Sequence, residues 1–335
     1  MIAYITRRLM WMVVVIFGVM TIAFFISRVV PADPVAAMLP PQAPQEAIEK
    51  ERAKWGLDEP IYKQYLTFVR KLLQGDLGTS IRTRSPVLSD LARYLPATIE
   101  LTLLSLFFGI GLGLPLGIIS AIRNGKLSDH FSRLFAIMGL SMPAFWTGIL
   151  LLLIFYHTLR ILPGPGQLPT YMGRPPRFTG FITLDSMIAG NWKAFWSAIR
   201  HMILPAFTLG WLSTAAITRI ARSSMLDVMR EDYIQTARMK GLREIRIILS
   251  HALKNALIPT VTVIGLRVAS LLEGAVLTET VFSWPGMGRY ATHSFLAIDF
   301  PAVVGAAMLF AFLYSFANLV VDIIYGYLDP RIRYD

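Results

Sequence analysis

Two ionisable side chains inside one apolar run are the residues of this sequence best placed to do chemistry. Arg267 and Glu273 both lie in the apolar stretch from Thr260 to Phe282. A charged group at membrane depth is costly and normally faces a cavity or a partner, so we expect both residues to line a pathway. They are six positions apart and do not share a helix face, so an ion pair between them is not expected.

Motifs for catalysis are absent from the sequence. There is no GxxxxGK(S/T) phosphate loop, so any ATP must be hydrolysed on another polypeptide. The five histidines form no HExxH motif, no GxSxG nucleophile motif occurs, and the lack of cysteine excludes disulfides and thiolate chemistry. We therefore expect no catalytic residue, metal site or cofactor in this chain, and an intramembrane enzyme is the weakest of the function classes considered.

The composition indicates an all-α polytopic membrane protein. Hydrophobic residues make up 55% of the 335 positions and charged residues only 16%, whereas a soluble domain carries about 25% charged residues. The net charge of +11 is spread over segments between apolar runs, which fits lipid head groups and protein partners better than nucleic acid.

Six apolar runs are long enough to span a membrane, since a span needs about 20 apolar residues. They are Leu9 to Val30, Ala97 to Ile122, Leu134 to Leu159, Met202 to Ile220, Thr260 to Phe282 and Ala302 to Tyr325. An even number of spans places both termini on one side. When the long segment 31–96 is set aside, about 15 Lys and Arg lie on the side of the termini against about 6 on the other, which predicts cytoplasmic termini.

The predicted organisation has three parts. Residues 1–30 form an N-terminal signal anchor, because the apolar run is too long for a cleaved signal peptide and no small-residue cleavage site follows it. Residues 31–96 form an extracytoplasmic helical cap, in which two segments run from proline to glycine as helices do. Residues 97–335 hold the other spans. Between them, 160–201 is expected to be an irregular outer loop, and SWPGMGRY, Ser283 to Tyr290, a re-entrant turn or short helix.

One polar segment, at about 221–258, lies on the cytoplasmic side in this arrangement. Within it, the stretch DYIQTARMKGLREIRIILSHALKNALIP predicts a short helix, a bend at Gly241 and a longer amphipathic helix that leads into a span at Pro259. The apolar residues spaced to share one face are Leu242, Ile245, Leu249, Ala252 and Ala256. Such a pattern fits a helix on the membrane surface, a solvated connector, or a helix pair held in a groove of a cytoplasmic partner, and periodicity alone does not separate them.

The same stretch resembles the coupling motif of ABC importer permeases. That motif has a Glu-Ala-Ala start, a glycine four residues after the second alanine, and a late Ile-x-Leu-Pro. Here Gln235, Thr236 and Ala237 precede Gly241, and Leu253 follows in HALK. Gln235, His251 and Lys254 depart from the motif, in the manner typical of the dipeptide and oligopeptide branch.

Further phrases resemble the first permease subunit of that branch, in the expected order along the chain. They include RRLMWMVVVIFGVMTIAFFISRVVPADP, GDLGTSIRTRSPVLSDLARYLPATIELTL, MPAFWTGILLLLIF, TETVFSWPGMGRY and YGYLDPRIR. The resemblance to this peptide, nickel and opine transporter family covers the chain from its first to its last residues.

This resemblance implies a function and a set of partners. It implies six transmembrane helices, a bacterial inner membrane location, a second homologous permease, two cytoplasmic ATPases that bind ATP and Mg²⁺, and an extracytoplasmic binding protein that delivers a peptide. It also implies that a loop docks in a groove of an ATPase. The residues expected to take part in that coupling are Tyr233, Gln235, Thr236, Ala237, Gly241, Leu242, Leu253 and Pro259.

Two questions stay open from the sequence. A secondary transporter or channel that works alone is the alternative function, although the inverted repeats and buried acidic relays of that class are not visible. Within the family the cargo could be a dipeptide, a longer peptide, a nickel chelate, glutathione or an opine-like conjugate.

One packing feature is predicted independently of function: Gly109, Gly113 and Gly117 form a small-xxx-small stripe that allows two helices to approach closely.

Overall fold

The computed structural model describes residues 2–29, 42, 44–54, 56 and 58–328. Within that part of the chain, the structure is helical and contains five helices long and apolar enough to cross a membrane. These candidate spans are Thr6–Ile26, Val87–Ile122, Trp192–Val228, Glu244–Leu272 and Phe300–Ile323. They belong in turn to helices α1 (Ile2–Val29), α5 (Val87–Ile122), α9 (Trp192–Val228), α12 (Leu253–Val281) and α14 (Phe300–Leu328).

The predicted third span is broken. Helix α6 (Leu127–Ser141) is followed by α7 (Ala144–Leu151) and a π-helical stretch, η1 (Leu152–Thr158), and the chain bends by 112° between the two parts. Pro143 lies at the break, and the residue before it, Met142, is extended at φ −93° and ψ 130°. Because proline disfavours the helical conformation in the residue before it, the apolar run from Leu134 to Leu159 forms two helices instead of one.

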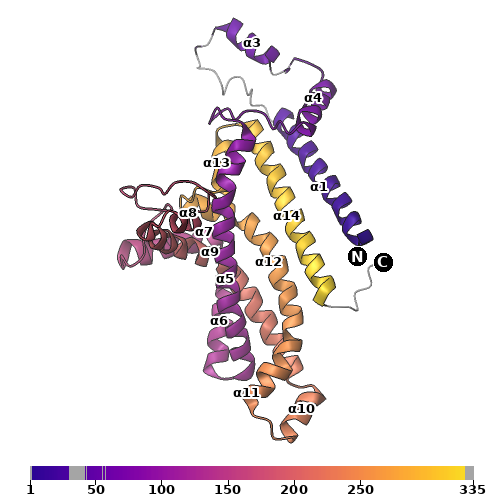
Figure 1. Ribbon diagram of the computed structural model, residues 1–335, viewed down its shortest axis with the longest axis vertical. Helices are drawn as coiled ribbons and strands as arrows, with labels where there is room; N and C mark the ends of the chain where they lie inside the picture. The colour runs from indigo at the N-terminus through magenta and orange to yellow at the C-terminus, as the bar shows by residue number, and fades with distance from the viewer. Residues whose placement is uncertain (1, 30–41, 43, 55, 57, 329–335) are drawn as a thin grey trace.

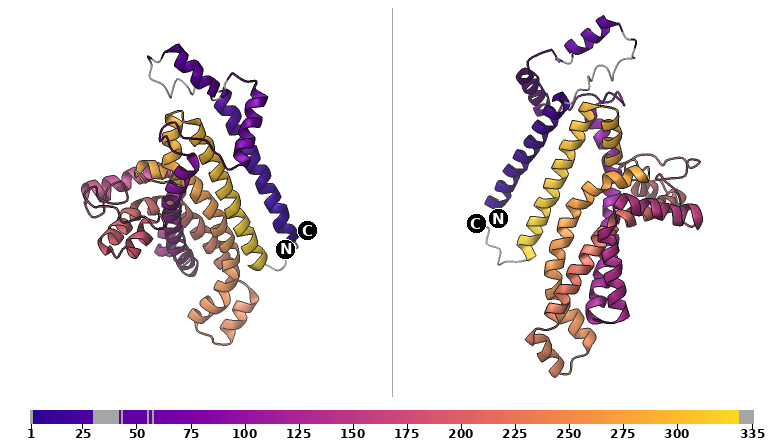
Figure 2. Two further views of the ribbon diagram at one scale, coloured as in Figure 1. Left: turned by 45° about the horizontal axis from the view of Figure 1, so that its top comes forward. Right: turned by 180° about the vertical axis from the view of Figure 1, so that it is seen from behind.

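The helices form a bundle with polar segments at both ends (Figure 1). Helix α9 packs on α5, α6 and α12, α14 packs on α12, and α1 packs on α14 at the edge of the bundle. Figure 2 shows α1 beside α14 from behind as well. Helices α10 (Asp232–Met239) and α11 (Glu244–Arg246) project from one end, which we call the coupling end. Helices α3 (Gln45–Lys54) and α4 (Ile61–Leu73) lie at the opposite end, the cap end.

The glycine stripe of α5 packs against α9, as the sequence predicts. A Cβ added at Gly113 would lie 2.9 Å from the carbonyl oxygen of Thr214, and one at Gly117 would lie 2.7 Å from the Cβ of Ala221. The hydroxyl of Thr218 donates to the carbonyl of Gly113 over 3.1 Å. Only a residue without a side chain allows the two backbones to come this close, so the stripe sets the distance between the helices.

Helices α3 (Gln45–Lys54) and α4 (Ile61–Leu73) form in the predicted cap segment. Helix α4 packs on the end of α1, where the ring of Phe24 stacks on Phe68 with centroids 5.3 Å apart. The hydroxyls of Thr21 and Tyr65 are hydrogen bonded at 2.7 Å. These contacts hold the cap beside the first span, while the division of the chain into three domains stays a prediction.

The outer loop is less irregular than the sequence predicts. Helix α8 (Ile182–Ile188) forms within it, and α9 begins at Trp192, ten residues before the expected span. The Asn191 side chain caps α9 by accepting from the amide of Ala194 at 3.0 Å. Asp185 accepts from three consecutive amides, those of residues 178–180. Burial raises the pKa of Asp185, but these hydrogen bonds outweigh it and lower the pKa overall.

Candidate functional site

The coupling end is a bent helix pair, as the sequence predicts. Helix α10 ends at Met239 and α11 begins at Glu244, and Gly241 between them has φ +73°. This left-handed conformation is strained for residues with a side chain and favours glycine. The bend is therefore encoded in the sequence at Gly241.

The inner side of the helix pair is fused to the membrane helices. The buried residues of this cluster are Ala121, Met225, Ile234, Ala237, Ile247, Ile248, Ala252 and Ala256. They come from α5, α9, α10, the π-helical stretch η2 (Ile247–Ala252) and the start of α12, so the helix pair cannot move without moving the ends of α5 and α9. Leu242 and Leu253 pack partly against the same cluster. Both leucines therefore contribute to the core of this chain.

The outer side of the helix pair presents an apolar rim. Met239 is 80% exposed, Ile245 60% and Leu249 57%, and Tyr233 is also exposed. The prediction that the apolar residues of this segment share one helix face is wrong. Ile245 and Leu249 face outward, whereas Ala252 faces inward. A π-helical turn, η2 (Ile247–Ala252), causes the difference. Its wider turn shifts the register of the residues that follow it.

Two polar contacts brace the bend from outside. The side-chain amide of Asn255 donates to the hydroxyl of Tyr233 at 2.7 Å, and Arg238 is paired with Glu244 at 2.9 Å. The other polar positions of the predicted motif, Gln235 and Thr236, are exposed on α10.

Pro259 does not begin the span that follows. It lies inside α12, whose first residue is Leu253. The coupling segment and the fifth span are therefore one continuous helix from Leu253 onward, which gives a stiff connection between them.

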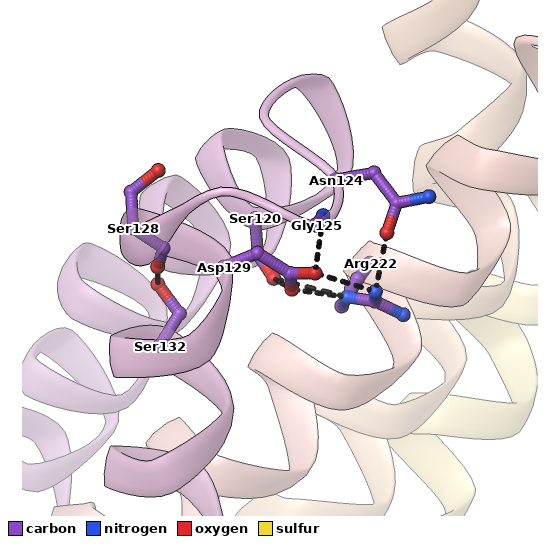
Figure 3. A network of polar contacts seen from close by, with 7 residues as sticks. All are labelled: Ser120, Asn124, Gly125, Ser128, Asp129, Ser132 and Arg222. Atoms are coloured by element: carbon purple, nitrogen blue, oxygen red, sulfur yellow. Dashed lines mark hydrogen bonds and ion pairs between the residues drawn. The ribbon is translucent and has the colours of Figure 1, made fainter.

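A buried ion pair next to the coupling end was not predicted from the sequence (Figure 3). Asp129 of α6 is 1% exposed and accepts from Nε and Nη2 of Arg222 on α9 at 2.8 and 3.0 Å. Its carboxylate also accepts from the Ser120 hydroxyl at 2.5 Å and the Gly125 amide at 3.0 Å. Arg222 donates in addition to the side-chain oxygen of Asn124 at 2.9 Å. The network ties the turn between α5 and α6 to α9, and its Ser120 is next to Ala121 of the buried cluster.

The predicted pathway residues lie on α12. Arg267 is half-buried and close enough to Arg219 of α9 for the two charges to repel, and neither has an acidic partner among the described residues. Glu273 follows six residues later on the same helix. The structure thus brings two arginines together at this depth, and a pathway-lining role for Arg267 and Glu273 stays a prediction.

The outer turn after α12 is fixed by a carboxylate that was also not predicted. Glu279 is fully buried, and it accepts from the Thr98 hydroxyl at 2.6 Å and the Arg289 amide at 3.1 Å. The indole of Trp284 donates to the carbonyl of Ala97 at 2.9 Å. A Cβ at Gly286 would lie 2.2 Å from the Glu279 carboxylate, so only glycine fits there. The turn then leads into α13 (Met287–Leu296), the short helix expected at SWPGMGRY.

Together these features define a class of protein: a multi-span helical membrane protein whose one end carries a rigid, apolar-rimmed helix pair fused to its spans. The chain belongs to the family described as "binding-protein-dependent transport system inner membrane component", which matches residues 113–334. The family of the N-terminal part of such membrane components matches residues 1–102. It is therefore an inner-membrane permease component of a binding-protein-dependent transport system.

Individual relatives agree over the whole chain. The chain is 46% identical to the probable D,D-dipeptide transport system permease protein DdpB of Escherichia coli K12, over 98% of this chain and 97% of that protein. It is 43% identical to the di/tripeptide transport system permease protein DppB of Pseudomonas aeruginosa, over 100% and 99%. It is 36% identical to the oligopeptide transport system permease protein AppB of Bacillus subtilis, over the full length of both.

A solved structure shares the fold. The inward-facing MetNI methionine ABC transporter matches with a TM-score of 0.52 and 15% identity, over 72% of this chain and 97% of that chain. At this identity the match shows the fold alone, and it agrees with the helical architecture described above.

Proposed function

We propose that this chain is one transmembrane subunit of a bacterial ABC importer for peptides, and that it forms half of the translocation pathway. The observation that carries the proposal is the helix pair at the coupling end, which is rigid on its inner side and apolar on its outer side. Full-length relatives named as dipeptide, tripeptide and oligopeptide permeases support peptides as the cargo.

The apolar rim supports docking on an ATPase. Met239, Ile245 and Leu249 are large, exposed and on one segment, as expected of a helix that lies in a groove of a partner. ATP and Mg²⁺ bind to two cytoplasmic ATPase subunits. When these subunits close, the displacement passes through the buried cluster to α5 and α9 and changes which side of the pathway is open.

The remaining partners follow from the same arrangement. A second, homologous permease completes the pathway, the spans contact membrane lipid, and an extracytoplasmic binding protein delivers the cargo at the cap end. The last residues of α14 and the first of α1 point toward the side of the molecule that carries the coupling end (Figure 1). This supports cytoplasmic termini, in agreement with the distribution of basic residues.

The proposal is tested by purifying the tagged chain in mild detergent, identifying the proteins that remain bound, and assaying ATP hydrolysis with loaded and empty binding protein. Two ATPase chains and a second permease, with hydrolysis raised by loaded binding protein, are expected. Recovery of the chain alone, active in liposomes without ATP, would mean a secondary transporter or channel.

A substitution at the rim tests the docking surface separately. Leu249→Asp places a charge on the exposed rim and should release the ATPases while the subunit stays inserted. The matched control is Leu127→Asp, because Leu127 is 88% exposed at the same end of the molecule but lies outside the rim. Equal loss of ATPase in both variants would contradict docking at the rim.

A further inference from the structure

A small pocket lies beyond the far end of α12, away from the coupling end. It has a volume of about 300 Å³ and lies between the loop from Gly166 to Arg174 and the turn from Ser283 to Arg289. The amide of Gly166 donates to the carbonyl of Phe282 at 2.8 Å, which joins the two walls. The volume is at the lower end of the range for small-molecule sites, about 300–1,000 Å³.

The charged residues that line this pocket are both arginines. Arg174 comes from the loop and Arg289 from the turn, and none of the lining residues is acidic. Arg174 has no hydrogen bond or ion pair within the described part of the chain. Two guanidinium groups without a carboxylate between them create a local positive potential, and both have N–H donors that can bind an anion.

Arg289 is held in place before any ligand binds. Its Nη1 donates to the carbonyl of Ser283 at 2.9 Å and its Nε to Nε2 of His293 at 3.3 Å. Its backbone is fixed as well, since its amide donates to the buried Glu279 carboxylate. These bonds leave the Nη2 donors without a partner among the described residues. A donor fixed in this way loses less entropy on binding than a free surface arginine.

We propose that this pocket is a carboxylate-binding site on the extracytoplasmic face, with Arg174 and Arg289 as its two donors. The carboxylate comes either from the C-terminus of a peptide entering the pathway or from an acidic side chain of the docked binding protein. This choice of sources rests on the proposed function, whereas the anion site itself does not. Charge-assisted hydrogen bonds from guanidinium to carboxylate are the chemistry that both sources share.

The site is tested first without any cargo. Because the chain has no cysteine, Thr170→Cys places a single thiol of this chain at the exposed pocket rim. In spheroplasts that hold the assembled transporter, its rate of modification is compared between an anionic and a cationic methanethiosulfonate. Arg174→Gln should lower the ratio of the anionic to the cationic rate about three- to fivefold, because one charge screened by salt changes each of the two rates about twofold and in opposite directions.

Lys193→Gln is the matched control, because Lys193 is exposed at the start of α9 and is not among the lining residues. It should leave the ratio unchanged. A ratio that does not respond to Arg174→Gln, or responds equally to Lys193→Gln, would overturn the anion site. Since no peptide or ATP takes part, this result is independent of whether the chain transports peptides.

The source of the carboxylate is tested by protection of the same thiol. Protection by the dipeptide Ala-Ala but not by its C-terminal amide supports the peptide carboxylate. Protection by empty binding protein that is lost with Arg174→Gln supports an acidic side chain. Arg289→Lys keeps the charge but loses the fixed Nη2 donors, so it should leave the reagent ratio near wild type and weaken either protection about tenfold. Failure of both ligands to protect in an Arg174-dependent way would overturn the proposal.

Discussion

Breaking the ion pair between Asp129 and Arg222, next to the coupling end, should destabilise the subunit. It should also weaken the coupling of the subunit to ATP hydrolysis. The perturbation is Arg222→Met, which keeps an unbranched apolar stem but removes the guanidinium group and its charge. Asp129 would then lose two charge-assisted hydrogen bonds and keep only those from Ser120 and Gly125. Its carboxylate would stay buried without a counter-charge.

The expected cost can be worked from the burial of the two partners. Removing one member of a fully buried pair costs about 3–5 kcal/mol. The side chain of Arg222 is 22% exposed and that of Asp129 only 2%, so solvent screens part of the interaction and about 2–3 kcal/mol is expected. Adding Asp129→Asn removes the orphaned charge, so the double variant should be more stable than Arg222→Met by about 1–2 kcal/mol.

The assay is denaturant unfolding of the purified transporter in detergent, run with its peptide-stimulated ATP hydrolysis. The turn between α5 and α6 should loosen from α9 in Arg222→Met, so hydrolysis should respond less to loaded binding protein. Arg123→Met is the control, because Arg123 is exposed in the same turn and its side chain has no described contact. The reasoning is refuted if Arg222→Met unfolds within about 0.5 kcal/mol of this control, or if the double variant is the less stable one.

Three further outcomes are expected. Gly241→Pro cannot adopt φ +73°, so ATPase should not co-purify with it; retained coupling would show that the bend is dispensable. Gly117→Val should destabilise the folded subunit by about 1–3 kcal/mol, because the added side chain overpacks against α9, and a thermal melt should show this. Gly111→Val, whose Cβ would meet nothing within 4 Å, should unfold like wild type in the same melt. Burial and the neighbouring Arg289 lower the pKa of His293 from 6.5, so just below pH 6.5 the unfolded chain binds more protons than the folded chain. The folded state should therefore lose stability as the pH decreases through this range. His293→Gln should flatten that slope in melts between about pH 5 and 7, and an unchanged slope would contradict this assignment.

The sequence alone determines the features that depend on neighbouring residues. Apolar run length placed five of the six predicted spans, the glycine in a polar helical stretch placed the bend at Gly241, and the four-residue spacing of the α5 glycines predicted a close helix contact. These succeed because the conformational preference of a residue and the face it occupies on a helix are set within a few positions. Family resemblance added the partners and the class of cargo, which no local pattern contains.

The tertiary structure decided which residues meet. Asp129 pairs with Arg222, 93 positions away, and Glu279 bonds Thr98, 181 positions away. Neither pairing has a local signal, because each depends on how close α6 and α9, or α5 and α12, come in space. The π-helical turn at Ile247–Ala252 likewise changed which apolar residues face outward, since one wider turn shifts every later side chain. Local sequence thus set the elements, and long-range packing set the polar networks and surfaces through which this permease acts.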